Sequence, residues 1–285
     1  MDKIEGVKTT VFSIHHHTNA DGSDLPLLKF PSFEKTGLVQ HGFSTRRGGV
    51  SQGYFSSLNL KFGNGDEAEN VEENYRRLSE AFGIEPSSFV FTDQTHTTNV
   101  RVVTGKDAGV GVTRPQDQYD IDGLVTNEPG LMLSAFFADC VPLFFLDPQN
   151  RAIGLSHSGW RGTVGRMGAA TIRTMQENYG TDPSALICAI GPSICQECYE
   201  VSEDVADAFK KAFPGHEKEL LYDKGGGKYQ LDLWEANRQV FLDAGVRPDH
   251  ITVTDLCTCH YPDLLFSHRA SHGKRGNLGA FLMLL

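Results

Sequence analysis

Two apolar runs near the middle of the chain organise the rest of the sequence. They span residues 131–146 and 152–155, and Asp147-Pro148-Gln149-Asn150 separates them. Proline restricts φ, while Asp and Asn side chains bond to their own backbone, so the separator predicts a turn between two buried strands. A hairpin folded at this turn would bring Cys140 and His157 to the same end of the strand pair.

The remaining pattern predicts an α+β fold of packed mixed β-sheets with flanking helices. Apolar residues at helical spacing predict helices over residues 66–82, 162–179, 202–213 and 231–244. Short apolar runs predict strands near residues 38–44, 89–91, 100–103, 122–126, 186–190, 251–256 and 278–285. Strands and helices alternate without the regular rhythm of a doubly wound sheet, which favours α+β. Residues 1–36 are weakly patterned, and we expect a segment of unclear role there, followed by a single catalytic domain over residues 37–285.

Composition limits the classes of partner. The net charge of −10 supplies no basic field for nucleic acid or an anionic membrane, so an anionic substrate would need a local positive pocket. No apolar run approaches the roughly 18–20 residues of a membrane helix. The N-terminus lacks a basic segment followed by an apolar one, and the six cysteines are too sparse for a disulfide scaffold. We therefore expect reduced thiols and a cytoplasmic protein.

The strongest candidate site combines His96, Cys140 and His157. Three nitrogen and sulfur ligands with one open position are typical of a catalytic zinc site. Zinc would keep the thiolate deprotonated and lower the pKa of a bound water. On spacing alone, a buried structural cysteine beside an unrelated histidine explains the same residues.

A cysteine hydrolase is the alternative use of these side chains. Cys140 would be a nucleophile activated by His157, with Asp139 orienting the base, and the substrate would be an amide or a cell-wall precursor. His96 distinguishes the two hypotheses, because a metal site needs it and a dyad does not. A third hypothesis is a non-enzymatic protein that binds a metal or a partner.

Two arginines indicate anion binding. Arg46 precedes Gly48-Gly49, where glycines would let backbone amides approach a ligand. Arg161 lies at a predicted helix start, a favourable place for anions. The alternatives are an ordinary turn with solvated arginines, and pairing of Arg161 with Asp139 or a terminal carboxylate.

Four further cysteines raise the question of a second metal site. They occur in Cys195-x-x-Cys198 and Cys257-x-Cys259-His260. The sequence favours simple packing, because Cys195-Gln-Glu-Cys198 lacks the turn residues of a zinc knuckle and Cys-x-Cys is a poor chelate.

Together these motifs resemble the YfiH/YlmD-type family, named multicopper polyphenol oxidoreductases (laccases) and regarded as purine nucleoside phosphorylases. The matching motifs run in family order and include Phe43-Ser-Thr-Arg-Arg-Gly-Gly-Val-Ser51, Gln94-Thr-His96, Asp122-Gly-Leu-Val-Thr126, Ala138-Asp-Cys-Val-Pro142, His157-Ser-Gly-Trp-Arg-Gly162 and Phe266-Ser-His-Arg269. The resemblance also implies a fold similar to the catalytic domain of the cytotoxic necrotizing factor toxins. Those toxins are cysteine hydrolases, so the hydrolase alternative stays open.

The resemblance implies specific roles and activities. It assigns the catalytic zinc to the metal ligands His96, Cys140 and His157. Beside these ligands, the residues themselves suggest catalytic roles for Asp139 and Arg46, and substrate binding by Ser44, Arg46, Gln94 and Arg161. The implied reactions are phosphorolysis of adenosine, inosine and methylthioadenosine, deamination of adenosine, and a weak phenol oxidation with copper. Phosphate held by Arg46 and Arg161 would attack ribose C1′, and Asp139 is the candidate proton carrier for attack of water at purine C6.

The laccase name and two departures limit what is carried over. A multicopper oxidase needs about ten histidines in His-x-His clusters, whereas this chain has no His-Cys-His and clusters its histidines only at residues 15–17. A single soft-ligand site can still take up copper in place of zinc. Ala270 and Arg275-Gly276-Asn277 stand where the family often has arginine and Thr-Gly-Arg, so substrate contacts of those arginines are not assigned here.

Overall fold

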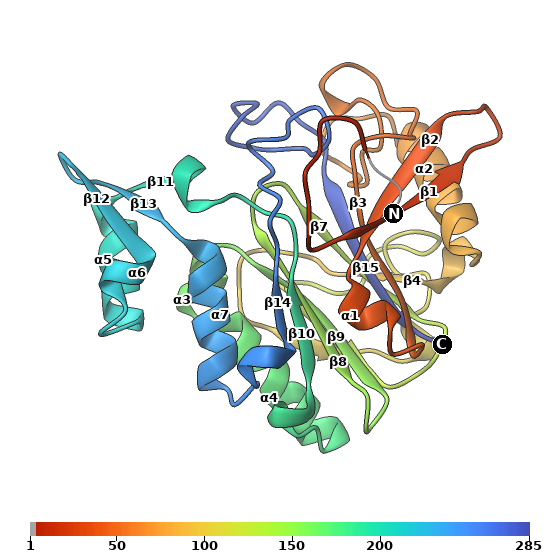
Figure 1. Ribbon diagram of the computed structural model, residues 1–285. Helices are drawn as coiled ribbons and strands as arrows, with labels where there is room; N and C mark the ends of the chain where they lie inside the picture. Colours follow the sequence, from red (N-terminus) through yellow and green to blue (C-terminus); the bar gives the residue numbers. More distant parts are fainter. Residues whose placement is uncertain (1–3) are drawn as a thin grey trace.

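Two mixed β-sheets lie face to face in the centre of the molecule (Figure 1). The structure is a computed structural model and describes residues 4–285. In this part of the chain the first sheet has the order β1 (Ser13–Thr18), β2 (Asp24–Lys29), β3 (Val39–Ser44), β15 (Leu278–Leu284), β7 (Met132–Phe137) and β4 (Phe89–Phe91). The second sheet has the order β14 (Ile251–Val253), β10 (Ile187–Ile190), β8 (Val141–Asp147), β9 (Ala152–Ser158), β6 (Gly123–Thr126) and β5 (Val100–Val102). Each sheet contains parallel as well as antiparallel pairs.

Strand β8 shows why the central sequence is so apolar. Successive side chains of a strand point to opposite faces. Phe144 and Leu146 pack into the core between the sheets, whereas Leu143 and Phe145 pack into a second core beneath the outer helices. All seven residues of β8 are buried. A strand covered on both faces needs apolar residues throughout, which explains the unbroken run.

Helices cover the two outer faces. The helices are α1 (Pro31–Glu34), α2 (Ala68–Phe82), α3 (Trp160–Val164), α4 (Met167–Tyr179), α5 (Glu203–Ala212), α6 (Glu217–Leu220) and α7 (Leu233–Asp243). Figure 1 shows α2 on one side of the sheets and α4 and α7 on the other. The apolar stripe of α2 packs on the first sheet, and Gly83 ends this helix with a φ of 65°. A small third sheet, β11 (Glu200–Ser202), β13 (Lys228–Leu231) and β12 (Leu221–Gly225), lies beside α5. The α+β class predicted from the sequence is confirmed.

The predicted strand pair is correct at the turn but wrong in its first half. Strands β8 and β9 form the expected antiparallel hairpin. The apolar run of residues 131–146, however, contains two strands, because β7 belongs to the first sheet and β8 to the second. The chain crosses between them at Asp139, whose φ is 86°. Apolar periodicity reports burial, and both strands are buried, so the pattern does not reveal the crossing.

The helix predicted over residues 162–179 is also two elements. Helix α3 ends at Val164 and α4 begins at Met167, with Arg166 between them at a φ of 60°. A left-handed residue cannot continue a right-handed helix. The short α3 is therefore a helix separate from α4, and it carries Arg161 beside the hairpin end.

The N-terminal segment contributes to the first sheet. Strands β1 and β2 form a hairpin, and β2 pairs with β3 through Leu27 and Leu28. His15-His16-His17 lies within β1. Among the described residues, no helix is both long and apolar enough to cross a membrane.

Candidate active site

The candidate ligands meet where the chain passes between the two sheets. His96 lies in the connection from β4 in the first sheet to β5 in the second, and Cys140 lies in the connection from β7 to β8. His157 belongs to β9 and pairs with Pro142. The predicted meeting of Cys140 and His157 at one hairpin end is confirmed, and the structure adds His96 to it.

The three donor atoms lie close enough to share one ion. All lie within 4.8 Å of one another, and Cys140 Sγ is 4.0 Å from His96 Nε2. Gly159 leaves this space open, since a Cβ there would stand 2.9 Å from His96 Cδ2 and 3.0 Å from Cys140 Sγ. One thiolate and two imidazoles form a donor set that suits zinc or copper. The residues present therefore fit the metal that the resemblance implies.

Asp122 holds two of the ligands in place. The carboxylate is fully buried and accepts a 2.8 Å hydrogen bond from His157 Nδ1. It also accepts bonds from the backbone amides of Thr95, His96 and Thr97, at 3.1, 3.2 and 2.8 Å. A proton on Nδ1 leaves the Nε2 lone pair of His157 directed away from Asp122, as a metal ligand requires. Asp122 thereby orients His157 and fixes the loop that carries His96.

The pKa values of Cys140 and His157 depend on each other and on their neighbours. Burial raises the pKa of the Cys140 thiol, but the adjacent His157 and His96 outweigh burial and bring the pKa below that of a free thiol. Burial lowers the pKa of His157, but Cys140 and Asp122 outweigh it and raise the pKa. Both shifts favour a thiolate, which is the ligand form and also the nucleophilic form of cysteine.

The side chain of Asp139 is engaged in structural contacts. Oδ1 accepts a 2.7 Å hydrogen bond from the Thr258 hydroxyl, and Oδ2 accepts one of 2.7 Å from the Arg269 backbone amide. Asp139 lines the cavity beside Cys140. It does not orient His157, because Asp122 occupies that position. In the cysteine hydrolase hypothesis, Asp122 therefore replaces Asp139 as the residue that orients His157.

A positively charged cavity opens next to the three ligands. Its volume is about 280 Å³. Three arginines line it, namely Arg161, Arg269 and Arg275. The Arg161 guanidinium lies 4.3 Å from the Trp160 ring centre and forms no ion pair among the described residues, so the alternative of pairing with Asp139 is not observed there. This cavity is the local positive pocket that a chain of net charge −10 needs for an anionic substrate.

The structure does not bring Arg46 into this cavity. Its guanidinium donates to the carbonyls of Ser56 and Pro262, at 2.7 Å each, and lines a different hollow. The neighbouring Gly49 serves close backbone packing, because a Cβ there would lie 2.2 Å from the Ser57 carbonyl oxygen. The absence of a side chain at Gly49, which suggested an anion pocket, therefore makes room for the backbone at Ser57.

Ser44 and Gln94 also make structural contacts. The buried Ser44 hydroxyl accepts a hydrogen bond from the Gly279 amide on β15. The Gln94 side chain donates to the Phe136 carbonyl and accepts from the Phe136 amide, at 2.7 and 2.9 Å. These two hydrogen bonds hold the loop that carries His96 against β7. Gln94 does not line the cavity.

Several residues of the cavity had no role assigned from the sequence. They are Asp122 behind the ligands and Tyr199, His268, Arg269 and Arg275 along the wall. The sequence assigns Arg275 no substrate contact, because the local motif departs from the family pattern. Arg275 nevertheless lines the cavity, and its Nε is buried without a hydrogen-bond partner among the described residues. The family motifs Asp122-Gly-Leu-Val-Thr126, Tyr199-Glu-Val201 and Phe266-Ser-His-Arg269 carried a signal that pointed to the other positions.

Comparisons with known proteins identify the family of this chain. A family model described as multi-copper polyphenol oxidoreductase laccase matches residues 40–285. The chain belongs to this family. It is 39% identical to purine nucleoside phosphorylase YlmD of Bacillus subtilis over 85% of this chain and 87% of that protein. It is 34% identical to adenosine deaminase RL5 of an unknown prokaryotic organism over 80% of this chain and 87% of that protein. The crystal structure of Bacillus licheniformis hypothetical protein YfiH matches with a TM-score of 0.87 and 32% identity, covering 95% of this chain and 99% of that one.

Proposed function

We propose that this member of the laccase family is a zinc-dependent purine nucleoside phosphorylase that also deaminates adenosine. The observation that carries the proposal is the three-ligand cluster beside a cavity lined by three arginines. Relatives named purine nucleoside phosphorylase and adenosine deaminase support both reactions. Adenosine, inosine and methylthioadenosine are the substrates that we assign.

The metal would be held by His96, Cys140 and His157. When bound, zinc supplies a Lewis acid at the inner end of the cavity. Copper suits the same donors, and we assign to it the weak phenol oxidation that the family description suggests. The Nδ1 proton of His157, held by Asp122, leaves Nε2 free for either ion, and Gly159 leaves space beside His96 and Cys140.

The arginines are placed to hold phosphate. A guanidinium presents forked donors that match phosphate oxygens, and the exposed Arg161 side chain in the cavity forms no ion pair among the described residues. We therefore transfer the phosphate-binding role from Arg46 to the three arginines of the cavity. Phosphate held there attacks ribose C1′ while the bond from C1′ to the purine breaks, and the purine leaves with the electron pair.

The cavity wall offers a place for the purine and a proton. Trp160 and Tyr199 supply aromatic surface, and Ile194 and Leu233 supply apolar surface. Burial raises the pKa of Tyr199, so its hydroxyl stays a hydrogen-bond donor. The exposed His268 lines the same cavity, and we assign it proton transfer to the departing base. Asp139 then acts as a positioning residue, because both its oxygens hold neighbouring segments.

The test is a product analysis of the zinc-loaded protein with adenosine. With phosphate present we expect adenine, inosine, ribose 1-phosphate and the hypoxanthine that phosphorolysis of inosine releases, and without phosphate only inosine. His96→Ala and Cys140→Ala should abolish both reactions, and Cys259→Ser, which keeps all three ligands, should retain them. Absence of every product, or full activity in Cys140→Ala, would refute the proposal.

A cysteine hydrolase is the second candidate, favoured by the shifted pKa values of Cys140 and His157. It predicts alkylation of Cys140 and an amidase activity that survives both chelation and His96→Ala. Loss of that activity in His96→Ala would exclude it, because a Cys-His pair oriented by Asp122 does not need the third ligand.

A further inference from the structure

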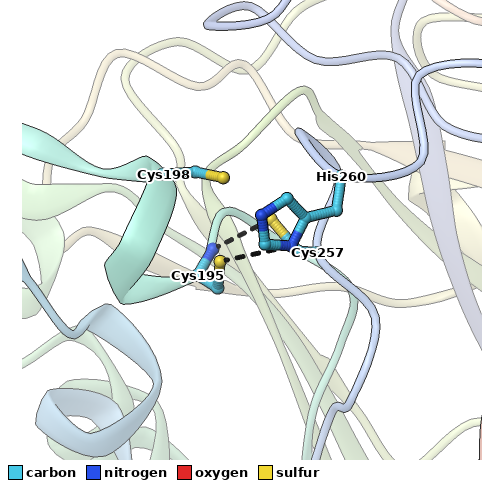
Figure 2. Close-up of side chains that lie close together, drawn as sticks. All are labelled: Cys195, Cys198, Cys257 and His260. Atoms are coloured by element: carbon cyan, nitrogen blue, oxygen red, sulfur yellow. Dashed lines mark hydrogen bonds between the residues drawn. The ribbon is translucent and has the colours of Figure 1, made fainter.

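A second cluster of ligand side chains lies outside the candidate active site. Cys195 and Cys198 come from the 3₁₀ turn η5 (Gln196–Cys198) and the residue before it, whereas Cys257 and His260 follow β14. Figure 2 shows the three sulfur atoms and the imidazole turned toward one another. All four donor atoms lie within 4.8 Å of one another. The cluster thus joins two segments that are far apart in the sequence.

The spacing between the Cys195 and His260 donors matches tetrahedral metal coordination. Metal–sulfur bonds of about 2.3 Å and metal–nitrogen bonds of about 2.0–2.1 Å place neighbouring donors roughly 3.5–3.8 Å apart. The distance from Cys195 Sγ to His260 Nδ1 is 3.8 Å. The cysteines are free thiols, and the set is Cys₃His, one of the standard sets of structural zinc sites. Four protein ligands leave no open position, in contrast to the candidate active site.

Neighbouring groups support ligation by these atoms. The Cys195 backbone amide donates a 3.3 Å hydrogen bond to Cys257 Sγ, an arrangement that stabilises a thiolate. The His260 ring turns Nδ1 toward Cys195, while its Nε2 lies 3.8 Å from a Glu197 carboxylate oxygen. A carboxylate on the far side of a ligating histidine is a common outer partner of zinc.

We propose that Cys195, Cys198, Cys257 and His260 bind a structural zinc ion. This proposal departs from the expectation of simple packing, which rested on the missing turn residues between Cys195 and Cys198 and on the poor Cys-x-Cys chelate. Those residues are not needed here, because each segment supplies two ligands and the fold brings the segments together. Cys259 is not part of the set, so the poor Cys-x-Cys chelate is not used.

The ion would brace one wall of the cavity. Ser193 and Cys257 already form a β-bridge, and the metal would lock the same two segments together. Arg269, which lines the cavity, donates from Nη1 to the Cys198 carbonyl at 3.1 Å. The Thr258 hydroxyl, next to Cys257, holds Asp139. The proposal does not depend on the nucleoside reactions, since it concerns a different set of ligands.

The test counts metal ions per chain by elemental analysis of the intact protein. We expect two ions in the wild type, one in His96→Ala, one in Cys198→Ser and none in the double variant. Cys259→Ser is the matched control, because it removes a thiol from the same segment without removing a ligand, and it should keep two. A wild type with one ion that disappears in His96→Ala would overturn the proposal, as would two ions in Cys198→Ser.

A second measurement keeps the proposal testable if Cys198→Ser does not fold. Alkylation of the native wild type, mapped by mass spectrometry, should modify Cys259 while Cys195, Cys198 and Cys257 stay protected until a strong chelator is added. Protection that is independent of chelator, or a mass showing a disulfide among these cysteines, would refute a metal site.

Discussion

Replacing Asp122 by asparagine tests how the candidate active site is organised. The carboxylate accepts five hydrogen bonds, from the amides of Thr95, His96 and Thr97, the hydroxyl of Thr97 and Nδ1 of His157. Asparagine has nearly the same shape but keeps one acceptor oxygen and gains an NH₂ group. Three of the five donors bond to Oδ2 and two bond to Oδ1. The NH₂ group of asparagine therefore loses fewer hydrogen bonds if it takes the position of Oδ1.

This placement sets the expected magnitude. The NH₂ group would face the His96 amide, which loses its acceptor at a cost of about 1–3 kcal/mol in the free energy of unfolding. It would also donate to His157 Nδ1, so that the ring proton moves to Nε2 and the metal-binding lone pair is lost. Removing such an outer partner typically weakens metal affinity by roughly 10–100-fold, or about 1.4–2.7 kcal/mol.

The assay is a zinc competition titration against a chromogenic chelator, with unfolding by urea measured in parallel. The Asp122→Asn variant and its control both carry Cys198→Ser. The titration then measures zinc binding at the His96, Cys140 and His157 site alone. Asp120→Asn is the matched control, because Asp120 accepts a bond from the Thr95 hydroxyl on the same loop but contacts no ligand. Equal zinc affinity of Asp122→Asn and the control would refute this account of Asp122.

Three further predictions follow from particular contacts. Arg161→Ala should raise the KM for phosphate roughly 10-fold or more through loss of a charged hydrogen bond, whereas Arg173→Ala, at an exposed position of α4, should not. Equal KM values for the two variants would show that Arg161 does not bind phosphate. Gly159→Ala should abolish zinc binding at the candidate active site, because the added Cβ would come within 3.0 Å of two ligand side chains; metal content equal to that of the wild type would contradict this. Burial holds the pKa of His41 at about 3, against 6.5 when unfolded, while its Nε2 accepts the Phe30 amide. Below pH 6.5 this residue therefore binds more protons in the unfolded state, and its contribution to the free energy of unfolding should fall by about 2 kcal/mol from pH 7 to pH 5. Urea titrations of His41→Gln should show a shallower pH slope, and an identical slope would contradict the assignment.

Local elements were predictable because their signals are local. The amphipathic stripe of α2 and its terminal glycine occur within one stretch of sequence, as do the turn residues between β8 and β9. The metal ligands were proposed from residue types and strengthened by the family motifs around Cys140 and His157. The hairpin register alone then sufficed to place those two residues at one end.

Other features were decided only by the tertiary structure. Asp139 marks a crossing between sheets, and Asp122 accepts a bond from a histidine 35 residues away. Arg46 donates to carbonyls of two other segments, and Cys195 meets Cys257 across 62 residues. Sequence by itself determined which segments are buried and which side chains carry reactive groups. The partner that each buried polar group finds depends on which segments pack together, because a buried donor or acceptor must be satisfied by whatever the fold brings within about 3 Å.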